Sequence, residues 1–274
     1  MNVAVTVARL GVPSAFVGRV STDGYGDLLW QHLSKSGVHL EAAERGPEPT
    51  ARAVVEHTPT PRFRFEGDGT ADTRLATVDL GVLGSGPHLL HGGTLGLFRG
   101  VTAETLADLV ESTDALISLD PNVRPQVIAD RGTWFRLFDR WVARASLVKV
   151  SSEDLAWIWP GATDDAVAHE LLGRGVAAVL VTHGADGAAA HLPYGRVGVP
   201  APTVEVVDTV GAGDAFCGGL LAHLWRCGVT DRAALEALDT DGWFGALSFA
   251  VTVAGLTCSR PGADPPWARD LVAG

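Results

Sequence analysis

The chain has 274 residues, 46% of them hydrophobic, which is enough for one large α/β domain with a full core. Its formal net charge of -11 argues against binding to nucleic acid or to anionic membranes. The three cysteines, Cys217, Cys227 and Cys258, lack metal or redox spacing and indicate a reduced, cytoplasmic protein. No apolar run reaches the length of a membrane span, and Arg9 interrupts the apolar N-terminus, which is therefore not a signal peptide.

Residues 1–86 predict a helix, a strand–helix unit and a pair of solvated strands. A helix is expected over 2–10, a strand over 14–18 and a second helix over 28–36. Residues 52–58 and 62–66 alternate apolar and polar side chains, which is typical of antiparallel strands with one wet face.

From about residue 87 onward, strands alternate with helices. Strands are expected over 87–91, 115–119, 147–150, 176–182 and 204–207. Helices are expected over 102–111, 134–143, 167–172 and 233–254, and two more are expected to begin at 151 and at about 214. Residues 188–191 and 196–199 are expected to form a peripheral hairpin. This alternation predicts an α/β fold with a doubly wound, mostly parallel sheet that helices cover on both faces.

The stretch 204–224 joins a β-branched run, a glycine turn and a helix. Gly211, Ala212 and Gly213 would leave backbone N–H groups free at the helix start, where the helix dipole adds roughly half a positive charge. Such a turn can hold a phosphate or the charge that develops during phosphoryl transfer. Asp214 is then suited to accept a proton from an attacking hydroxyl. The alternative is a structural turn in which Asp214 only begins the helix.

The ungapped string DTVGAGDAF, at 208–216, resembles the C-terminal signature of the ribokinase-type (pfkB) carbohydrate kinases. A dinucleotide fingerprint would need a third glycine in place of Phe216, and no Walker A Lys-Ser or Lys-Thr pair follows the turn. The resemblance, nearest the bacterial fructokinase branch, implies one ribokinase-like domain over 1–274, with the strands of a small β lid inserted at about 38–66. It also implies that Asp214 is the catalytic base and that the N–H groups of Gly211, Ala212 and Gly213 hold the developing charge.

The same resemblance implies three sugar-binding residues. Asn2 matches the asparagine of the family's motif of two glycines and an asparagine, and Asp23 matches a D-x-[FY]-G element near the sugar and the lid. The alternative for Asp23 is a helix cap. Arg124 ends a run, Asp-Pro-Asn-Val-Arg, that resembles the DPN-x-R motif of fructokinases. Arg124 would bind the sugar or the transferred phosphoryl group, or else be a solvated arginine after a rigid proline turn.

For the nucleotide and its ions, the resemblance implies a further set of residues. The nucleotide-binding residues would be Lys149, Ser151, Asp154, Thr182, Gly184 and Gly187. Ser151 and Asp154 stand where the family has an N-x-x-E element that helps to hold Mg²⁺ through water; the alternative is a capped helix N-terminus. Asp208 and the carbonyl of Val210 match a monovalent-cation site for K⁺, together with the 258–263 loop.

The implied reaction is ATP-dependent transfer of the γ-phosphoryl group to a sugar hydroxyl, with O6 of fructose as the first choice. A 2-dehydro-3-deoxygluconate kinase or another sugar kinase of the family is the alternative, and an inactive, truncated nucleotide-binding domain is an alternative of another class. The expected partners are the sugar, ATP and, through the lid, a second copy of the chain; no nucleic acid or membrane is expected. Because the chain opens inside a helix, an upstream strand, a substrate-binding aspartate, lid strands and a glycine pair would be missing. We therefore expect the chain as written to be poorly soluble, unstable or weak in sugar binding.

Overall fold

The computed structural model describes residues 1–56, 62–86 and 88–271. Its main sheet has six strands in the order β10-β9-β8-β7-β6-β5. The strands are β5 (Leu89–Gly93), β6 (Leu116–Asp120), β7 (Leu147–Ser151), β8 (Ala178–Thr182), β9 (Ala188–Leu192) and β10 (Gly195–Val199). Strands β5 to β8 are parallel, whereas β9 and β10 are antiparallel to their neighbours. The predicted mostly parallel sheet is therefore confirmed.

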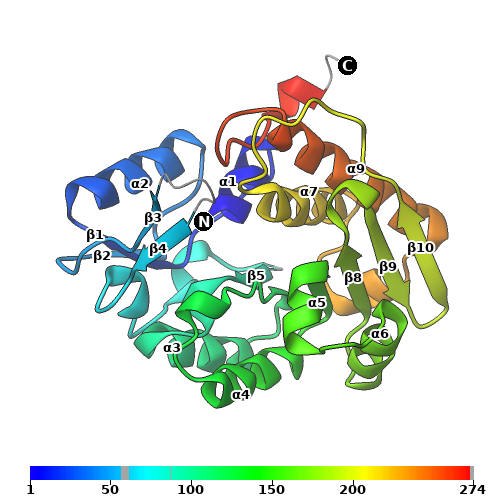
Figure 1. Cartoon of the computed structure of the whole chain (residues 1–274), viewed down its shortest axis with the longest axis horizontal. Coiled ribbons are helices and arrows are strands. Elements are labelled where there is room, and N and C mark those ends of the chain that lie inside the picture. The colour runs from blue at the N-terminus through cyan, green and yellow to red at the C-terminus, as the bar shows by residue number, and fades with distance from the viewer. Residues whose placement is uncertain (57–61, 87, 272–274) are drawn as a thin grey trace.

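Helices cover both faces of this sheet (Figure 1). One face carries α3 (Gly100–Ser112), α4 (Arg131–Val142), α5 (Ser152–Ile158) and α6 (Asp164–Gly173), and the other carries α1 (Asn2–Arg9), α7 (Ala212–Arg226), α8 (Arg232–Glu236) and α9 (Thr240–Cys258). Successive residues of a strand serve opposite faces. In β7, Leu147 packs with Phe216 of α7, whereas Val148 packs with Trp134 of α4. The fold is the expected doubly wound α/β fold.

A smaller part of the chain projects beside the sheet (Figure 1). It contains β1 (Gly18–Ser21), α2 (Gly24–Lys35), β2 (Ala43–Gly46), β3 (Arg52–Glu56) and β4 (Arg62–Glu66). Strands β3 and β4 pair antiparallel, as predicted, and residues 57–58 of the predicted strand lie outside the described residues. The strand expected over 14–18 begins instead at Gly18 and pairs with β2, while Ala15 only bridges to His39. We call β1 to β4 the lid.

Short 3-10 turns connect these elements: η1 (Ala71–Thr73), η2 (Leu80–Leu83), η3 (Leu95–Leu97), η4 (Pro125–Val127), η5 (Gly184–Asp186) and η6 (Ala268–Leu271).

Three further sequence expectations are wrong. The hairpin β9–β10 forms as predicted, but it is an edge of the main sheet and not a separate peripheral unit, because the turn at Gly187, with φ +101°, returns β9 directly along β8. Residues 204–207 form no strand: Val206 and Val207 are 61% and 57% exposed, and the N–H of Val207 donates to the carbonyl of Cys258 at the end of α9 rather than to a strand. A β-branched run favours a strand only where a sheet edge is available to pair with it.

The third error concerns the C-terminal helix. The predicted helix over 233–254 is two helices, because the Asp239 side chain caps the N–H of Gly242 and starts α9 afresh. Helix α9 has 19 residues and a hydropathy of 1.2, so by length and composition it could cross a membrane, which the sequence reading had not anticipated. Its Trp243 and Leu247 are instead buried in the core with residues of α7. It is a core helix of this fold.

Candidate active site

The glycine turn begins helix α7 at the carboxyl end of the sheet. Gly211 is the N-cap residue, with φ +80° in the left-handed region, and the helix starts at Ala212, two residues earlier than predicted. A Cβ atom on Gly211 would lie 2.6 Å from the Cβ atom of Ala263, so the turn and the 258–263 loop approach each other closely. Glycine is therefore required here for both its backbone angle and its size.

The turn presents free backbone donors. The N–H of Ala212 donates to the carbonyl of Thr209 at 3.2 Å, so it is not available to a ligand, contrary to the sequence expectation. Within the described residues, the N–H groups of Gly211, Gly213 and Asp214 have no hydrogen-bond acceptor. These three groups lie where a helix dipole is positive, and together they form an arrangement suited to an anion.

Asp214 lies in the first turn of α7 and contacts the other end of the chain. The Nδ2 atom of Asn2 donates a hydrogen bond of 2.8 Å to Asp214 Oδ2 across 212 positions of sequence. Helix α1 can approach α7 because Gly218 has no side chain; a Cβ atom there would lie 2.5 Å from the Cβ atom of Thr6. The structure thus brings together Asp214, the predicted catalytic base, and Asn2, a predicted sugar-binding residue.

A buried ion pair lies under this turn. Lys149 Nζ is 3.0 Å from Asp120 Oδ2, and both side chains are less than 5% exposed. Cys217 Sγ of α7 donates to the same carboxylate oxygen at 3.4 Å. The burial of Lys149 argues against the direct nucleotide contact that the family resemblance implied.

Ser151 and Asp154 form a capping box at the start of α5. The Asp154 carboxylate is buried: Oδ1 accepts from the N–H of Val123 at 2.6 Å, and Oδ2 accepts from the N–H and the hydroxyl of Ser151 at 2.9 and 2.7 Å. All of its contacts serve the helix start and the 121–124 loop. This geometry fits the interpretation that Ser151 and Asp154 cap the start of α5. It does not fit a role in binding the water molecules of a metal ion.

The segment after β8 forms a turn at the same sheet edge. Thr182 pairs in register with Ser151, and Gly184 has φ +54° with open space around its α-carbon. Gly187 is different, because a Cβ atom there would lie 2.1 Å from the carbonyl of Val199. Gly187 is therefore needed for the packing of β10, whereas Thr182 and Gly184 lie with Ser151 at the carboxyl end of the parallel strands.

The proposed sugar-binding residue Asp23 is the N-cap of α2. Its carboxylate accepts from the N–H of Gly26 at 2.7 Å and from both the N–H and the hydroxyl of Thr50 at 2.8 and 2.7 Å. These donors hold the pKa of Asp23 well below its usual range. Asp23 therefore links the start of α2 to the segment that precedes β3. This is the helix-cap role that the sequence left open as the alternative.

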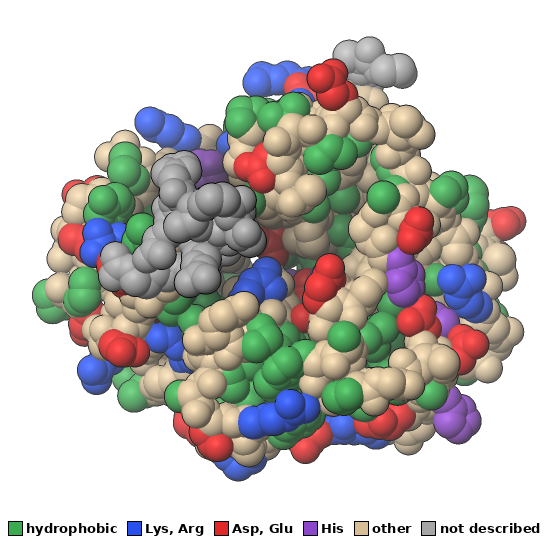
Figure 2. Space-filling model, viewed as in Figure 1, with side chains coloured by type: hydrophobic (Ala, Val, Ile, Leu, Met, Phe, Trp, Pro, Cys, Tyr) green, Lys and Arg blue, Asp and Glu red, His purple; other side chains and the backbone are tan. Residues whose placement is uncertain are grey.

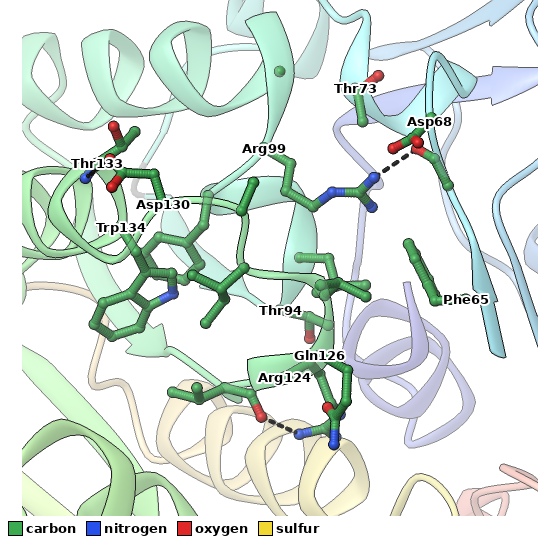
Figure 3. A pocket seen from close by; sticks show the side chains of 18 of the residues that line it. Phe65, Asp68, Thr73, Thr94, Arg99, Arg124, Gln126, Asp130, Thr133 and Trp134 are labelled. Atoms are coloured by element: carbon green, nitrogen blue, oxygen red, sulfur yellow. Dashed lines mark hydrogen bonds between the residues drawn. The ribbon is translucent and has the colours of Figure 1, made fainter. Parts of the chain in front are cut away.

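Two neighbouring cavities open between the lid and the sheet, and the space-filling view shows this face hollowed near its centre (Figure 2). One cavity, of about 940 Å³, is lined by Arg74, Arg99 and Arg124 among others. Figure 3 shows Arg99 and Arg124 on either side of Thr94. The other cavity, of about 1050 Å³, is lined by Asn2 and Asp214 as well as Thr94. Thr94 thus borders both spaces.

Sequence reasoning missed two residues that line the cavity with Asp214. His91 of β5 contacts Ser118 Oγ through Nδ1 at 3.1 Å, and burial lowers its pKa to about 4. Thr94 has φ +70°, and its hydroxyl accepts from Asn122 Nδ2 at 3.2 Å. Only the glycine pair at 92–93 marked this strand end in the sequence, because a single histidine or threonine carries no motif.

Asp208 lies where the K⁺ site was expected. Its Oδ1 accepts from the N–H of Val210 at 3.0 Å, and its Oδ2 accepts from the N–H of Gly262 at 2.9 Å. The 258–263 loop is therefore next to Asp208, as the sequence reading anticipated. Within the described residues, no group of three His, Cys, Asp or Glu side chains is arranged to hold a metal ion.

Comparison with known proteins gives a consistent result. The model for pfkB family carbohydrate kinases matches residues 1–269. A fructokinase of Rhizobium leguminosarum bv. trifolii is 35% identical over 241 residues, which cover 87% of this chain and 74% of the relative. Among solved structures, a fructokinase from Xylella fastidiosa with bound ATP has a TM-score of 0.88 and 28% identity, and the match covers 96% of this chain and 84% of that one.

A second solved structure adds bound ligands to the comparison. A fructokinase double mutant from Vibrio cholerae O395, in a form with fructose, ADP and potassium ion, has a TM-score of 0.81 and 27% identity over 96% of this chain and 84% of that one. The suspected resemblance is confirmed by the family match and by the fold. The chain belongs to the pfkB family of carbohydrate kinases, which are phosphotransferases with an alcohol group as acceptor.

Proposed function

We propose that this chain transfers the γ-phosphoryl group of ATP to O6 of fructose. The observation that carries the proposal is the position of Asp214, which is held by Asn2 and lies in a turn with three free backbone N–H groups, those of Gly211, Gly213 and Asp214 itself. A carboxylate next to an anion site is unfavourable unless it takes part in the reaction. A proton acceptor adjacent to an oxyanion site is the pair of functions that phosphoryl transfer to a hydroxyl requires.

The proposed step is an in-line displacement. The O6 hydroxyl attacks the γ-phosphorus while Asp214 takes its proton; the bond between O6 and phosphorus forms, and the bond between the γ-phosphorus and its bridging oxygen breaks, which releases ADP. The N–H groups of Gly211, Gly213 and Asp214 donate to the phosphoryl oxygens, on which negative charge is concentrated. Asn2 keeps the Asp214 carboxylate turned toward the cavity and has its amide oxygen free to contact the sugar.

We take MgATP, rather than ATP with a protein-held magnesium ion, as the substrate. Mg²⁺ commonly keeps several waters and binds through substrate phosphates. Asp154 does not fit as a partner for metal-bound water, because both of its oxygens are engaged within the protein. We also propose a K⁺ site at Asp208 and the Val210 carbonyl, and the potassium-bound relative supports it. A homodimer formed through the lid is a separate proposal.

Fructose is proposed because the relatives described above are fructokinases. A sugar acid such as 2-dehydro-3-deoxygluconate is the second candidate. Three arginines line the cavity of about 940 Å³, and guanidinium groups recognise carboxylates well.

The experiment is a coupled assay of ADP release over a panel of neutral sugars and sugar acids, with the product identified by NMR. Sugar-dependent turnover with fructose and phosphate on O6 is expected. Turnover only with a sugar acid would replace the substrate, and ATP binding without turnover on any sugar would favour an inactive nucleotide-binding domain.

A further inference from the structure

We propose that Lys149 is a positioning residue for phosphoryl transfer, which fixes a positive charge, paired with Asp120, beneath the turn that carries Asp214. This inference rests on the proposed function of that turn. Lys149 contacts no surface from which a ligand could approach, so its effect would reach the reaction through Gly213, Asp120 and Asp214.

The strand geometry points Lys149 at α7. In β7, Val148 and Val150 pack with the core on the α4 side, and Leu147 packs with the core on the α7 side. Lys149 alternates with the two valines, so its side chain lies on the α7 side. A Cβ atom on Gly213 would lie 3.4 Å from Lys149 Nζ. The ammonium group is therefore directly below the residue whose N–H is free.

The groups that face Lys149 and Asp214 come from five elements. They are Asp120 of β6, Asp154 of α5, Asp214 and Cys217 of α7, His91 of β5 and the N-terminal amine that precedes α1. Burial raises the pKa of the Cys217 thiol and lowers that of His91, so both groups are neutral at pH 7. Burial also lowers the pKa of the N-terminal amine.

Three carboxylates therefore face one strongly held cation. Burial, the largest single effect, would lower the pKa of Lys149, but the neighbouring acidic groups, Asp120 first among them, together outweigh it, and the net result is a raised pKa and a charged lysine. Without that charge, the carboxylates would repel a nucleotide phosphate at this turn more strongly.

A structural role alone does not explain such a pair. Removing two charges from water is expensive, and replacing a buried ion pair by apolar residues is often neutral or stabilising. A pair kept under the turn in which the N–H groups of Gly211, Gly213 and Asp214 are free is better explained by its field on the reaction, because fixed charges act most strongly where water is excluded.

The test uses three variants and one measurement that does not depend on turnover. In Lys149→Met, sugar-dependent kcat is expected to fall about 10- to 100-fold. This is less than the roughly 100- to 1000-fold loss known for a donor that touches the oxyanion, because Lys149 acts from beneath the turn. The KM for the sugar should change little. Lys149→Arg keeps the charge and should recover part of kcat.

The double variant Lys149→Met/Asp120→Asn is the matched control, because it leaves no unpaired buried charge. We expect it to melt close to the wild-type temperature and still to be slow, because its net charge is that of the wild type but the positive charge next to Gly213 is lost. A double variant that recovers wild-type kcat would overturn the proposal, since the pair would then serve folding only.

The activity-independent readout is the dissociation constant for ADP, measured by isothermal titration calorimetry without sugar. Because the lysine charge lies next to Gly213, its loss is expected to weaken ADP binding in Lys149→Met, whereas Lys149→Arg should bind ADP more tightly than Lys149→Met. Unchanged ADP binding in Lys149→Met would overturn the inference about Lys149 even in an active kinase. Absence of turnover in the wild-type chain on every sugar would instead contradict the proposed function, and the calorimetry would still decide the electrostatic role of Lys149.

Discussion

Replacing Gly211 by alanine is expected to destabilise the protein measurably, whereas the same change at Gly213 is not. Gly211 has φ +80° and ψ 0°, a conformation that costs an alanine roughly 1–2 kcal/mol. The new Cβ atom would also lie 2.6 Å from the Cβ atom of Ala263, well inside the usual separation of about 3.5–4 Å between carbon atoms. The 258–263 loop or the turn must therefore move.

The two effects together amount to about 2–4 kcal/mol, if the steric term is of the size usual for overpacking, roughly 1–3 kcal/mol, and partly relaxes. For a chain of this size, each kcal/mol shifts the melting temperature by about 2–4 °C, so a fall of roughly 5–15 °C is expected. Circular dichroism melts with and without ATP, run beside the ADP-release assay, measure both stability and turnover.

Gly213→Ala is the matched control. Its backbone is not left-handed, and its Cβ atom would lie 3.4 Å from Lys149 Nζ, which is an ordinary contact. Its melting temperature should stay within about 2 °C of the wild type, while a methyl group between the free N–H groups and the lysine lowers sugar-dependent turnover. If Gly211→Ala melted like the wild type with full turnover, the reasoning about the turn would be refuted.

Three further predictions follow from the site. Asn2→Ala should lower kcat/KM for the sugar about tenfold in steady-state assays, because Asp214 loses the hydrogen bond that orients it; an unchanged value would remove Asn2 from the site. His91 has a pKa of about 4 in the folded protein, against 6.5 in the unfolded chain. The neutral histidine therefore contributes at most about 3 kcal/mol to the free energy of unfolding above pH 6.5, and this contribution is lost as the pH falls toward 4. His91→Gln should flatten the fall in melting temperature between pH 7 and 4.5, and an equally steep fall would count against the buried neutral histidine. Ser151→Ala should lower the melting temperature by about 2–4 °C through loss of the cap and leave the KM for MgATP unchanged; a raised KM with normal melting would favour the nucleotide-binding role instead.

Most of the architecture follows from local patterns in the sequence. The alternation of strands and helices, and the antiparallel lid pair, depend on side-chain periods that a single segment carries. The errors arose where contacts outside a segment decide: Val206 and Val207 are exposed and pair with no strand, and β9 belongs to the main sheet only because it pairs with β8. Local patterns contain neither fact.

The site was predictable to a similar degree. The glycine turn, Asp214 and Asn2 were placed by motifs, and the structure brings them together. Motifs alone could not tell that Lys149 is buried against Asp120, nor that both oxygens of Asp154 are engaged, because burial and hydrogen bonding depend on strands that are far apart in the chain. His91 was missed for the same reason.

The central claim is that Asp214 is the base in phosphoryl transfer to a sugar, and the most direct measurement is the sugar-dependent turnover of Asp214→Asn. The amide preserves the size of the side chain and the turn, so the melting temperature and ATP affinity should stay close to the wild-type values. Turnover should fall by about a hundredfold or more, the usual effect of losing a positioned base. A variant that folds, binds ATP and phosphorylates the sugar at a near-normal rate would contradict the claim.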